Sequence, residues 1–369
     1  MNNDDYNKYK NFAMKNFPSN ENNKKTNIEW IKNIQQYMNK SKNKCVNEYE
    51  KLSTLNEGAI WKVYLVKRYY YEDEFHKKIR TNFYAMKRTH IMTQYKRRYF
   101  KDNKMINYFE EVLNEIQIYL ILNNKNDFVV KLFQILFDLN NNHQYLYLIN
   151  EYFDCGCIMN RDNVNYNHFH NPKIIKCFYN EIKLEFESEN LIKKNYLNIN
   201  IKHSIAKILF KKIFLGLKFI HSKRISHRDI KIENILFDSK DKNPKIIDFS
   251  ISTIHNNNNN FINEPAGSIH YQAPEIFSDS TIKNKGFYDA FKADVWSVGI
   301  CLFIFIYEEF PFDGESELQL QINIGEKKLN PPFNSENKDF DSLLEKLLEK
   351  DPDNRLTEID KILECEYFK

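Results

Sequence analysis

The chain has 369 residues, a length that exceeds one average domain and suits a two-lobed enzyme or two small domains. Its 54 basic and 50 acidic residues leave a net charge of only +4, which argues against a dominant field that attracts nucleic acid or anionic membrane. The six cysteines are scattered, and their one close pair has a single spacer where structural zinc sites use two to four, so we expect a reduced, cytoplasmic protein.

The first 46 residues are rich in Asn and Lys and lack the apolar stretch of a secretory signal. Within them, apolar side chains recur at helical spacing over Asn27–Met38, at Trp30, Ile31, Ile34 and Tyr37. We therefore predict an N-terminal extension over residues 1–46, with a helix that packs onto the main body.

Residues 47–150 show short runs typical of strands, with one long helical pattern among them. The strand-like runs are Lys62–Lys67, Asn82–Lys87, Val129–Phe137 and Gln144–Asn150, and the helical segment is Tyr108–Leu122. The pattern predicts a small, mostly antiparallel β lobe with one main helix.

Residues 151–369 are mostly helical in pattern, at His203–His221, Lys292–Tyr307 and Phe340–Glu349, with a strand-like interval at Ile235–Ile247. The most apolar stretch, Val295–Tyr307, is shorter than the about 20 residues that a bilayer-spanning helix needs. We therefore predict a larger, mainly α lobe with a buried core helix and no membrane insertion.

Three polar, weakly periodic stretches interrupt these patterns, at Tyr69–Arg80, His90–Lys104 and Asn160–Asn200. We expect them to be loops or appended helices. The asparagine run Asn256–Asn260 is long enough to make its own loop mobile.

The strongest motif is the segment His227-Arg228-Asp229-Ile230-Lys231-Ile232-Glu233-Asn234. Asp248-Phe249-Ser250 and Ala273-Pro274-Glu275 follow it. In their order and spacing these segments resemble the catalytic loop, metal-binding loop and substrate-loop anchor of eukaryotic-type protein kinases. The resemblance spans about Tyr49 to Phe368 and implies the α+β, bilobal kinase fold. It also implies a serine/threonine protein kinase that uses ATP and Mg²⁺.

Phosphoryl transfer needs a proton acceptor, metal ligands and a cation that neutralises phosphate charge. The resemblance implies that Asp229 accepts the proton, that Asn234 and Asp248 hold Mg²⁺, and that Lys231 steadies the γ-phosphate. A lysine at that place marks the serine/threonine group, and Ser268 matches the hydroxyl that bridges the catalytic aspartate and lysine.

In the small lobe, Lys87 resembles the strand lysine that grips the α- and β-phosphates, and Glu115 resembles its helical ion-pair partner. The resemblance implies a nucleotide site formed by Leu55, Gly58, Val63, Ala85, Lys87, Glu151, Phe153 and Leu236. Asn150 then falls at the back of the base pocket, where a buried amide would need partners, and a shifted register is the alternative there.

Two departures from the family pattern favour a second interpretation. The loop Leu55–Val63 keeps only the middle glycine of three, Gly58, and Asn56 and Trp61 replace the others, which indicates a stiffer loop with the indole over the phosphates. Ser250 replaces the glycine after Asp248-Phe249. The alternative is a pseudokinase or scaffold module that binds nucleotide weakly. The presence of Lys87, Glu115, Asp229, Asn234 and Asp248 argues against it.

Arg228 resembles the arginine that pairs with a phosphorylated residue of the activation loop in many kinases. Glu264 stands where relatives carry that residue, so a carboxylate could replace the phosphate and keep the loop ordered without phosphorylation. In that case Glu264→Ala lowers activity severalfold. The alternatives are that Glu264 is a solvated loop residue and that Ser252 or Thr253 is phosphorylated.

The expected partners are protein substrates, with Glu233 gently favouring basic ones. The basic cluster Lys96, Arg97, Arg98, Lys101 and Lys104 lacks aromatic interleaving, so no nucleic acid is expected. The resemblance further implies that Asp294 braces the catalytic loop and that Glu275 pairs with Arg355. The sequence leaves the oligomeric state open.

Overall fold

The computed structural model describes residues 29–31, 34–38, 43–71, 78–101, 104–122, 124–137, 145–161, 168–178, 198–256, 259–277, 287–327 and 337–369. The chain forms two compact units. The small unit contains residues 1–125 and 130–152, and the large unit contains residues 126–129 and 153–369. The predicted lobe boundary at residue 150 thus lies two residues before the division after Tyr152.

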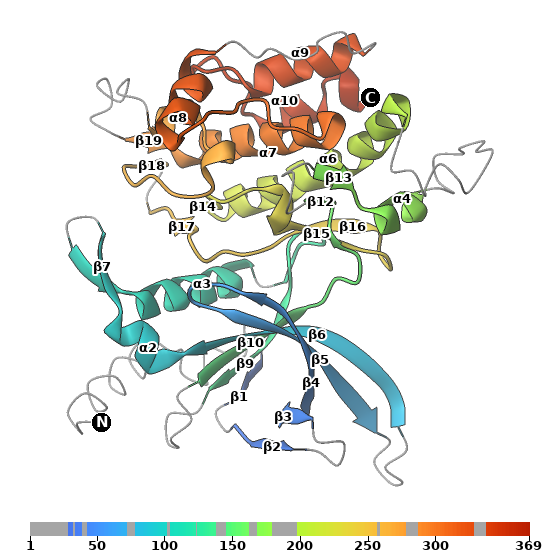
Figure 1. The fold of residues 1–369 in the computed structure, drawn as a ribbon, viewed down its shortest axis with the longest axis vertical. Helices are drawn as coiled ribbons and strands as arrows, with labels where there is room; N and C mark the ends of the chain where they lie inside the picture. The colour runs from blue at the N-terminus through green and yellow to red at the C-terminus, as the bar shows by residue number, and fades with distance from the viewer. Residues whose placement is uncertain are drawn as a thin grey trace. The chain divides into compact units, whose positions relative to one another are not determined.

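An eight-stranded sheet forms most of the small unit, in the order β1-β9-β10-β6-β5-β4-β3-β2 (Figure 1). Its strands are β1 (Glu29–Ile31), β2 (Gln36–Met38), β3 (Lys44–Val46), β4 (Tyr49–Glu57), β5 (Lys62–Tyr71), β6 (Lys78–His90), β9 (Leu132–Phe137) and β10 (Tyr145–Glu151). All neighbouring strands are antiparallel except β1 and β9. This confirms the predicted, mostly antiparallel lobe.

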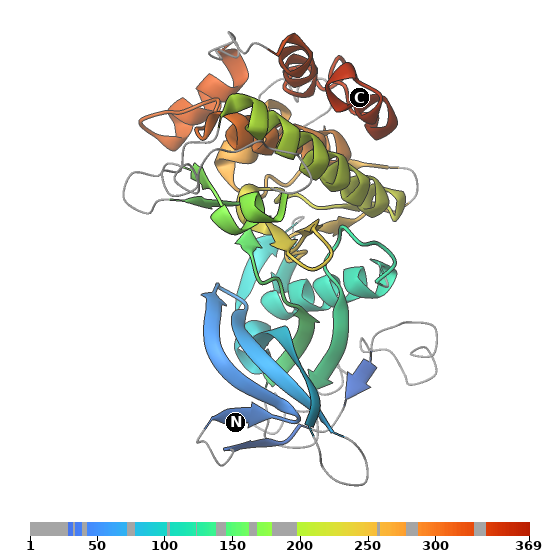
Figure 2. The same ribbon diagram turned by 90° about the vertical axis from the view of Figure 1, so that its right-hand side faces the viewer.

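The other elements of the small unit lie beside this sheet (Figure 2). They are α2 (Ile91–Lys96), the hairpin of β7 (Arg98–Lys101) with β8 (Lys104–Asn107), and α3 (Tyr108–Leu122). Helix α3 has the predicted bounds and buries Val112, Ile116 and Tyr119.

The helix predicted at Asn27–Met38 is wrong for the described residues of that range. Glu29–Ile31 pairs with β9, and Gln36–Met38 pairs with β3, at the other side of the sheet. Between these strands, Ile34 is buried in a core cluster on one sheet face, with Tyr49, Val66, Met86 and Ile149. The unpaired backbone groups of edge strands attract such pairing, and here they outweigh a weak helical spacing.

The predicted insertions also carry more regular structure than expected. Around Tyr69–Arg80 the chain extends the hairpin of β5 and β6, with Tyr69 paired to Thr81 and Tyr71 to Lys78. Tyrosine and threonine favour strands, which explains why these residues are not a loop. Residues 90–104 contain the appended helix α2, as predicted, and also the unpredicted hairpin strand β7.

The large unit is mainly helical. Its helices are α4 (Pro172–Phe178), α6 (Ile199–Ser222), α7 (Ala290–Tyr307), α8 (Glu317–Glu326), α9 (Lys338–Leu347) and α10 (Ile359–Leu363). Its short strands are β11 (Gly156–Cys157), β12 (Met159–Arg161), β13 (His168–His170), β14 (Ile225–Ser226), β15 (Ile235–Asp238), β16 (Asn243–Ile246), β17 (Thr253–Ile254), β18 (Phe261–Ile262) and β19 (Tyr288–Asp289). Single 3₁₀ turns occur at η2 (Ile232–Asn234), η3 (Ile269–Tyr271), η4 (Pro274–Ile276) and η6 (Glu366–Phe368).

The third predicted insertion, Asn160–Asn200, is described only in part. Strands β12 and β13 pair there, and α4 follows them, whereas residues 162–167 and 179–197 lie outside the described part. Of the run Asn256–Asn260, whose loop is predicted to be mobile, residues 257 and 258 also lie outside it.

Helix α7 forms the centre of the large unit. It is long and apolar enough to cross a membrane by length and composition, with a mean hydropathy of 1.6, but 83% of it is buried inside the structure. Its first turn is capped by Asp289, whose side chain accepts from the N–H groups of Phe291 and Lys292. Burial confirms the predicted core helix.

A buried histidine on α6 makes the stability of the large unit sensitive to acid. His203 is 4% exposed, and its ring packs against Phe340 and Tyr367. Burial, with help from Lys207 and Lys202, lowers the pKa of His203 to about 4. As the pH falls from 6.5 towards 4, this histidine binds a proton in the unfolded chain but stays neutral in the folded chain. The free energy of unfolding therefore decreases.

We expect the wild-type chain to lose about 2 kcal/mol of unfolding free energy through His203 between pH 7 and pH 5. In His203→Gln this part of the pH dependence disappears. Urea denaturation at both pH values measures it, with the half-buried Ser204→Ala on the same helix as the control. Equal pH dependence in wild type and His203→Gln would contradict the assignment.

Candidate active site

One face of the small unit's sheet collects the residues predicted to line a nucleotide. Val63 lies opposite Lys87 in the β5–β6 ladder, and Asn150 lies opposite Ala85 in the β6–β10 ladder. Because side chains alternate along a strand, these four residues share a face. The other face carries the core cluster around Met86.

Lys87 and Glu115 form a buried ion pair. Lys87 Nζ lies 2.6 Å from Glu115 Oε1, and the two side chains are 12% and 0% exposed. The indole Nε1 of Trp61 donates to the other carboxylate oxygen, Glu115 Oε2, at 2.7 Å. Lys87 Nζ also lies 5.3 Å from the centroid of the Trp61 ring. Trp61, expected over the phosphates, therefore contacts the ion pair itself.

Other residues of the predicted nucleotide site lie on or next to strands of their own unit. Leu55 is 45% exposed near the end of β4, and the N–H of Gly58 donates to the Trp61 carbonyl at 2.8 Å. The Glu151 N–H donates to the Lys131 carbonyl within the sheet. In the large unit, Phe153 is buried and Leu236 lies on β15 opposite Lys245.

Asn150 is a buried polar residue of β10. It is 4% exposed, and neither amide atom has a hydrogen-bond partner in the described part of the chain. A shift by one residue would move the side chain to the other face of the sheet, whereas the ladder to Ala85 is regular. The β10 ladder is thus regular towards β6 at Asn150, whereas towards β9 it shifts register between Ile149 and Asn150.

In the large unit, the structure brings together the residues predicted to perform proton and phosphate chemistry. Asp229 Oδ2 pairs with Lys231 Nζ at 2.7 Å and accepts from Asn234 Nδ2 at 3.1 Å. Asp229 Oδ1 accepts from the backbone N–H and the hydroxyl of Ser268, both at 3.0 Å. Lys231 Nζ also donates to the Ser268 hydroxyl at 2.9 Å. Ser268 thus bridges Asp229 and Lys231.

Asp294 holds the backbone of this loop. Its two carboxylate oxygens accept from the N–H groups of His227 and Arg228 at 2.8 Å, and His221 contacts it at 2.9 Å. Burial alone would raise the pKa of Asp294, but the bonds from His221 and Arg228 and the charge of His221 lower it below its usual value. The carboxylate therefore stays charged and fixes Arg228 in its left-handed conformation, with φ of 68°.

The segment around Asp248 is attached to the same loop. The Ile247 N–H donates to the Asn234 carbonyl at 3.0 Å, and the Phe249 ring is buried against His227. Asp248 itself has a φ of 66°. This backbone bond keeps Asn234 and Asp248 on adjacent segments.

These two residues fit a Mg²⁺ ion by the chemistry of their donor atoms. The amide nitrogen of Asn234 is fixed by two bonds to Asp229, so its amide oxygen is the atom left for a cation. Amide and carboxylate oxygens are hard ligands of the kind that Mg²⁺ prefers. The ligands predicted from the sequence are chemically suitable.

Arg228 contacts the loop that carries Glu264, but in a different way from the one predicted. Its guanidinium donates to the backbone carbonyl of Glu264 at 2.7 Å and to the Thr253 hydroxyl at 2.9 Å. Tyr288 donates to the same carbonyl. The sequence predicted the Glu264 carboxylate as the partner, whereas the contact observed is with the main chain.

Gly267 allows this loop to approach the catalytic loop. It has a φ of 92°, and a Cβ atom there would lie 2.3 Å from the Arg228 carbonyl oxygen. A side chain would therefore displace Ser268 from Asp229.

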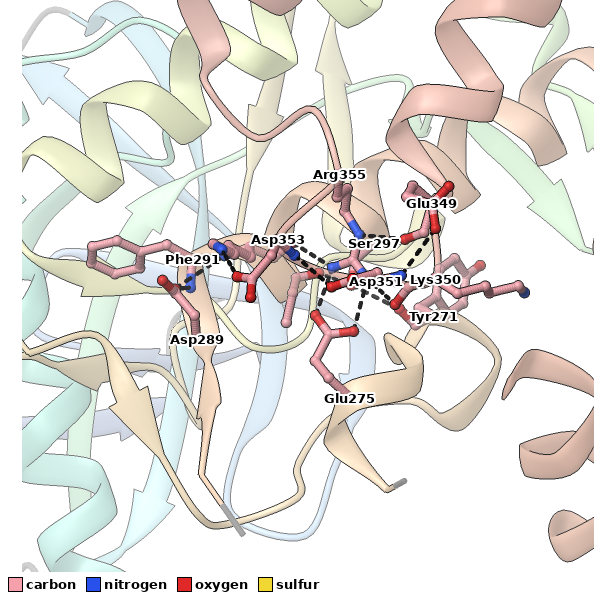
Figure 3. Close-up of polar contacts among 12 residues, drawn as sticks. Tyr271, Glu275, Asp289, Phe291, Ser297, Glu349, Lys350, Asp351, Asp353 and Arg355 are labelled. Carbon is pink, nitrogen blue, oxygen red and sulfur yellow. Dashed lines mark hydrogen bonds and ion pairs between the residues drawn. The ribbon is translucent and has the colours of Figure 1, made fainter. Parts of the chain in front are cut away.

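The anchor of this loop lies deeper in the large unit (Figure 3). Arg355 pairs with Glu275 through two bonds of 2.6 and 2.8 Å, and the residues are 4% and 7% exposed. Ser297 donates to the Tyr271 carbonyl at 2.8 Å, and the Tyr271 hydroxyl donates to Glu233 at 3.3 Å. The predicted pair of Glu275 with Arg355 is confirmed.

Sequence reasoning missed two residues that hold the loop before β5. Arg97 donates to the Ala59 carbonyl at 2.8 Å, and Gln94 donates to the Ile60 carbonyl at 3.4 Å. Both residues come from a stretch interpreted as an insertion, with Arg97 assigned to a solvated face. No motif in the sequence indicates these contacts.

The chain matches the family model described as a protein kinase domain over residues 81–368. It is 36% identical to serine/threonine-protein kinase ppk34 of Schizosaccharomyces pombe over 148 residues, which is 40% of each chain. It is 37% identical to serine/threonine-protein kinase par-4 of Caenorhabditis elegans, over 44% of this chain and 25% of that protein. It is 31% identical to CBL-interacting protein kinase 2 of Oryza sativa subsp. japonica, over 46% of this chain and 37% of that protein. The matches thus span two fifths or less of the length of these relatives.

Proposed function

The chain belongs to the protein kinase family, and we propose that it transfers the γ-phosphate of ATP to serine and threonine hydroxyls of other proteins. The observation that carries the proposal is the position of Asp229, which bonds Lys231, Asn234 and Ser268 at once. A carboxylate held in this way can accept the proton of an acceptor hydroxyl while the neighbouring ammonium meets phosphate charge.

Each residue then has a defined task. Asp229 orients the acceptor hydroxyl and takes its proton, and Lys231 stabilises the transferred phosphate. Lys87, held by Glu115, binds the α- and β-phosphates. Asn234 and Asp248 would hold Mg²⁺, which when bound neutralises phosphate charge.

We further propose protein substrates with basic residues near the acceptor, and a cytoplasmic location. Glu233 supports the substrate preference. Its carboxylate accepts from the hydroxyl of Tyr271, which belongs to the loop that follows Ser268. A peptide array compares basic, neutral and acidic flanks. A preference for acidic flanks would contradict this assignment.

A scaffold module remains the second candidate because Trp61 lies against Lys87, the residue that should grip phosphate. The change in melting temperature on addition of Mg²⁺ and ATP distinguishes a kinase from a scaffold module. A clear shift supports the kinase, and no shift at millimolar nucleotide supports the scaffold.

The direct test is transfer of labelled phosphate from ATP to generic basic proteins, followed by analysis of the modified amino acids. We expect phosphoserine and phosphothreonine. Phosphotyrosine as the main product, or no product despite nucleotide binding, would overturn the proposal.

We propose that the loop before Ser268 is ordered without phosphorylation, through the main chain of Glu264. Arg228→Leu removes the donor to that carbonyl and should lower activity severalfold, whereas Glu264→Ala keeps the carbonyl and should change activity little. Activity of the unphosphorylated protein measures both. A larger loss in Glu264→Ala than in Arg228→Leu would show that the carboxylate carries the effect, as the sequence suggested.

A further inference from the structure

The loop between β4 and β5 is held from outside the sheet. Its turn is closed by the bond from the Gly58 N–H to the Trp61 carbonyl. Arg97, which follows α2, donates to the Ala59 carbonyl, and its guanidinium lies 4.4 Å from the centroid of the Tyr108 ring at the start of α3. The loop is therefore tied to the helical part of the small unit.

A second tie comes from α2 itself. Gln94 is 4% exposed, donates to the Ile60 carbonyl at 3.4 Å, and accepts from Arg97 at 3.4 Å. Gln94 and Arg97 thus donate hydrogen bonds to successive backbone carbonyls of the loop. These contacts fix the backbone immediately before Trp61.

The side chain of Trp61 continues this connection to α3. It is 6% exposed, and its Nε1–H reaches Glu115 Oε2 while Lys87 reaches Glu115 Oε1. Glu115 is therefore held through both oxygens, by a charge-assisted hydrogen bond on one side and an ion pair on the other. The indole ring also lies near the lysine ammonium, and the negative face of an aromatic ring attracts such a cation.

We propose that Trp61 is a positioning residue that holds the ion pair of Lys87 with Glu115, and that Gln94 and Arg97 hold the loop from which it projects. A glycine at this place could supply neither the N–H donor nor the ring. The catalytic consequence rests on the proposed function, because the ion pair matters to the rate only if the chain transfers phosphate. The structural coupling of Trp61 with Glu115 does not depend on that function.

Two substitutions of Trp61 separate positioning from simple obstruction. Trp61→Phe keeps a ring near Lys87 but removes the donor to Glu115, so we expect kcat to fall about tenfold with a smaller change in the KM for ATP. Trp61→Gly removes both the ring and the N–H donor and should lower kcat further. If the indole only obstructed the lysine, Phe would change little, and Gly would lower the KM and raise the activity.

A double-mutant cycle with Trp61→Phe and Glu115→Leu tests the coupling on stability, measured by urea denaturation of the full chain. We expect Trp61→Phe to change the unfolding equilibrium constant roughly tenfold more in wild type than in Glu115→Leu, which has no acceptor for the indole N–H. Ser53→Ala, exposed on the strand before the loop, is the matched control and should show no coupling. Additive effects of the two substitutions would overturn the proposal.

Tryptophan fluorescence gives a readout without any assay of activity. The chain has three tryptophans, so the spectrum of Trp61→Phe subtracted from wild type gives the emission of Trp61. Arg97→Met should shift this emission to the red, because the loop becomes less ordered and the indole becomes exposed to water. An unshifted emission would contradict the role of Arg97. If the double-mutant cycle shows coupling but the wild type transfers no phosphate, the proposed function is refuted. The role of Trp61 in positioning Glu115 would still stand.

Discussion

Asp229→Asn is expected to lower the rate of phosphate transfer by about 10²- to 10⁴-fold, the range that a positioned general base contributes. The amide oxygen of asparagine can still accept from the Ser268 backbone and hydroxyl, so the loop keeps these contacts. The charge that pairs with Lys231 is lost, and with it the ability to take a proton. Nucleotide binding should persist, because Lys87, Asn234 and Asp248 are unchanged.

The measurement is phosphate transfer to a basic protein by wild type and Asp229→Asn side by side, with thermal shift by Mg²⁺ and ATP. Asp360→Asn is the matched control, since this aspartate is 68% exposed in a surface ion pair with Lys218. Equal loss of activity in the control would point to a preparation effect. Retained activity in Asp229→Asn would place the reaction elsewhere or assign it to a contaminant.

Short-range motifs allowed the residues that meet around Asp229 in the large unit to be predicted. Asp229, Lys231 and Asn234 lie within six residues, so their mutual geometry is set by one loop and by the 3₁₀ turn η2. Asp294 was predicted to brace this loop and does so through two backbone N–H groups. Local spacing therefore accounts for the first three residues, and the family resemblance accounts for Asp294.

Contacts between distant segments were predicted only where the family resemblance supplied them, as for Glu275 with Arg355, and the others were missed. Trp61 and Glu115 are 54 residues apart, and Arg97 meets Ala59 across 38 residues. Nothing in the local pattern specifies these pairs, because they depend on how α2 and α3 pack beside the sheet. The same limit explains why an amphipathic spacing around Ile34 suggested a helix, whereas pairing with the sheet edges produced strands.

Arg355→Met should destabilise the chain by about 3–5 kcal/mol, the typical cost of breaking a buried ion pair by removing one partner. Glu275, whose side chain is 8% exposed, would lose both bonds from the guanidinium (Figure 3). Arg355 also donates to the Glu349 carbonyl at 2.9 Å, so the turn before α10 would lose a contact as well.

Urea denaturation measures the loss, and two further variants show its origin. Glu275→Leu combined with Arg355→Met should be less destabilising than Arg355→Met alone, because no unpaired charge is left in the interior. Lys292→Met is the matched control: it breaks a pair with Asp353, which is 84% exposed, and should cost about 1 kcal/mol or less. A double variant as unstable as the single one would mean that the backbone contacts of Arg355, and not its charge, hold the anchor. In that event the loop that presents Ser268 to Asp229 would depend on the shape of this turn more than on its electrostatics.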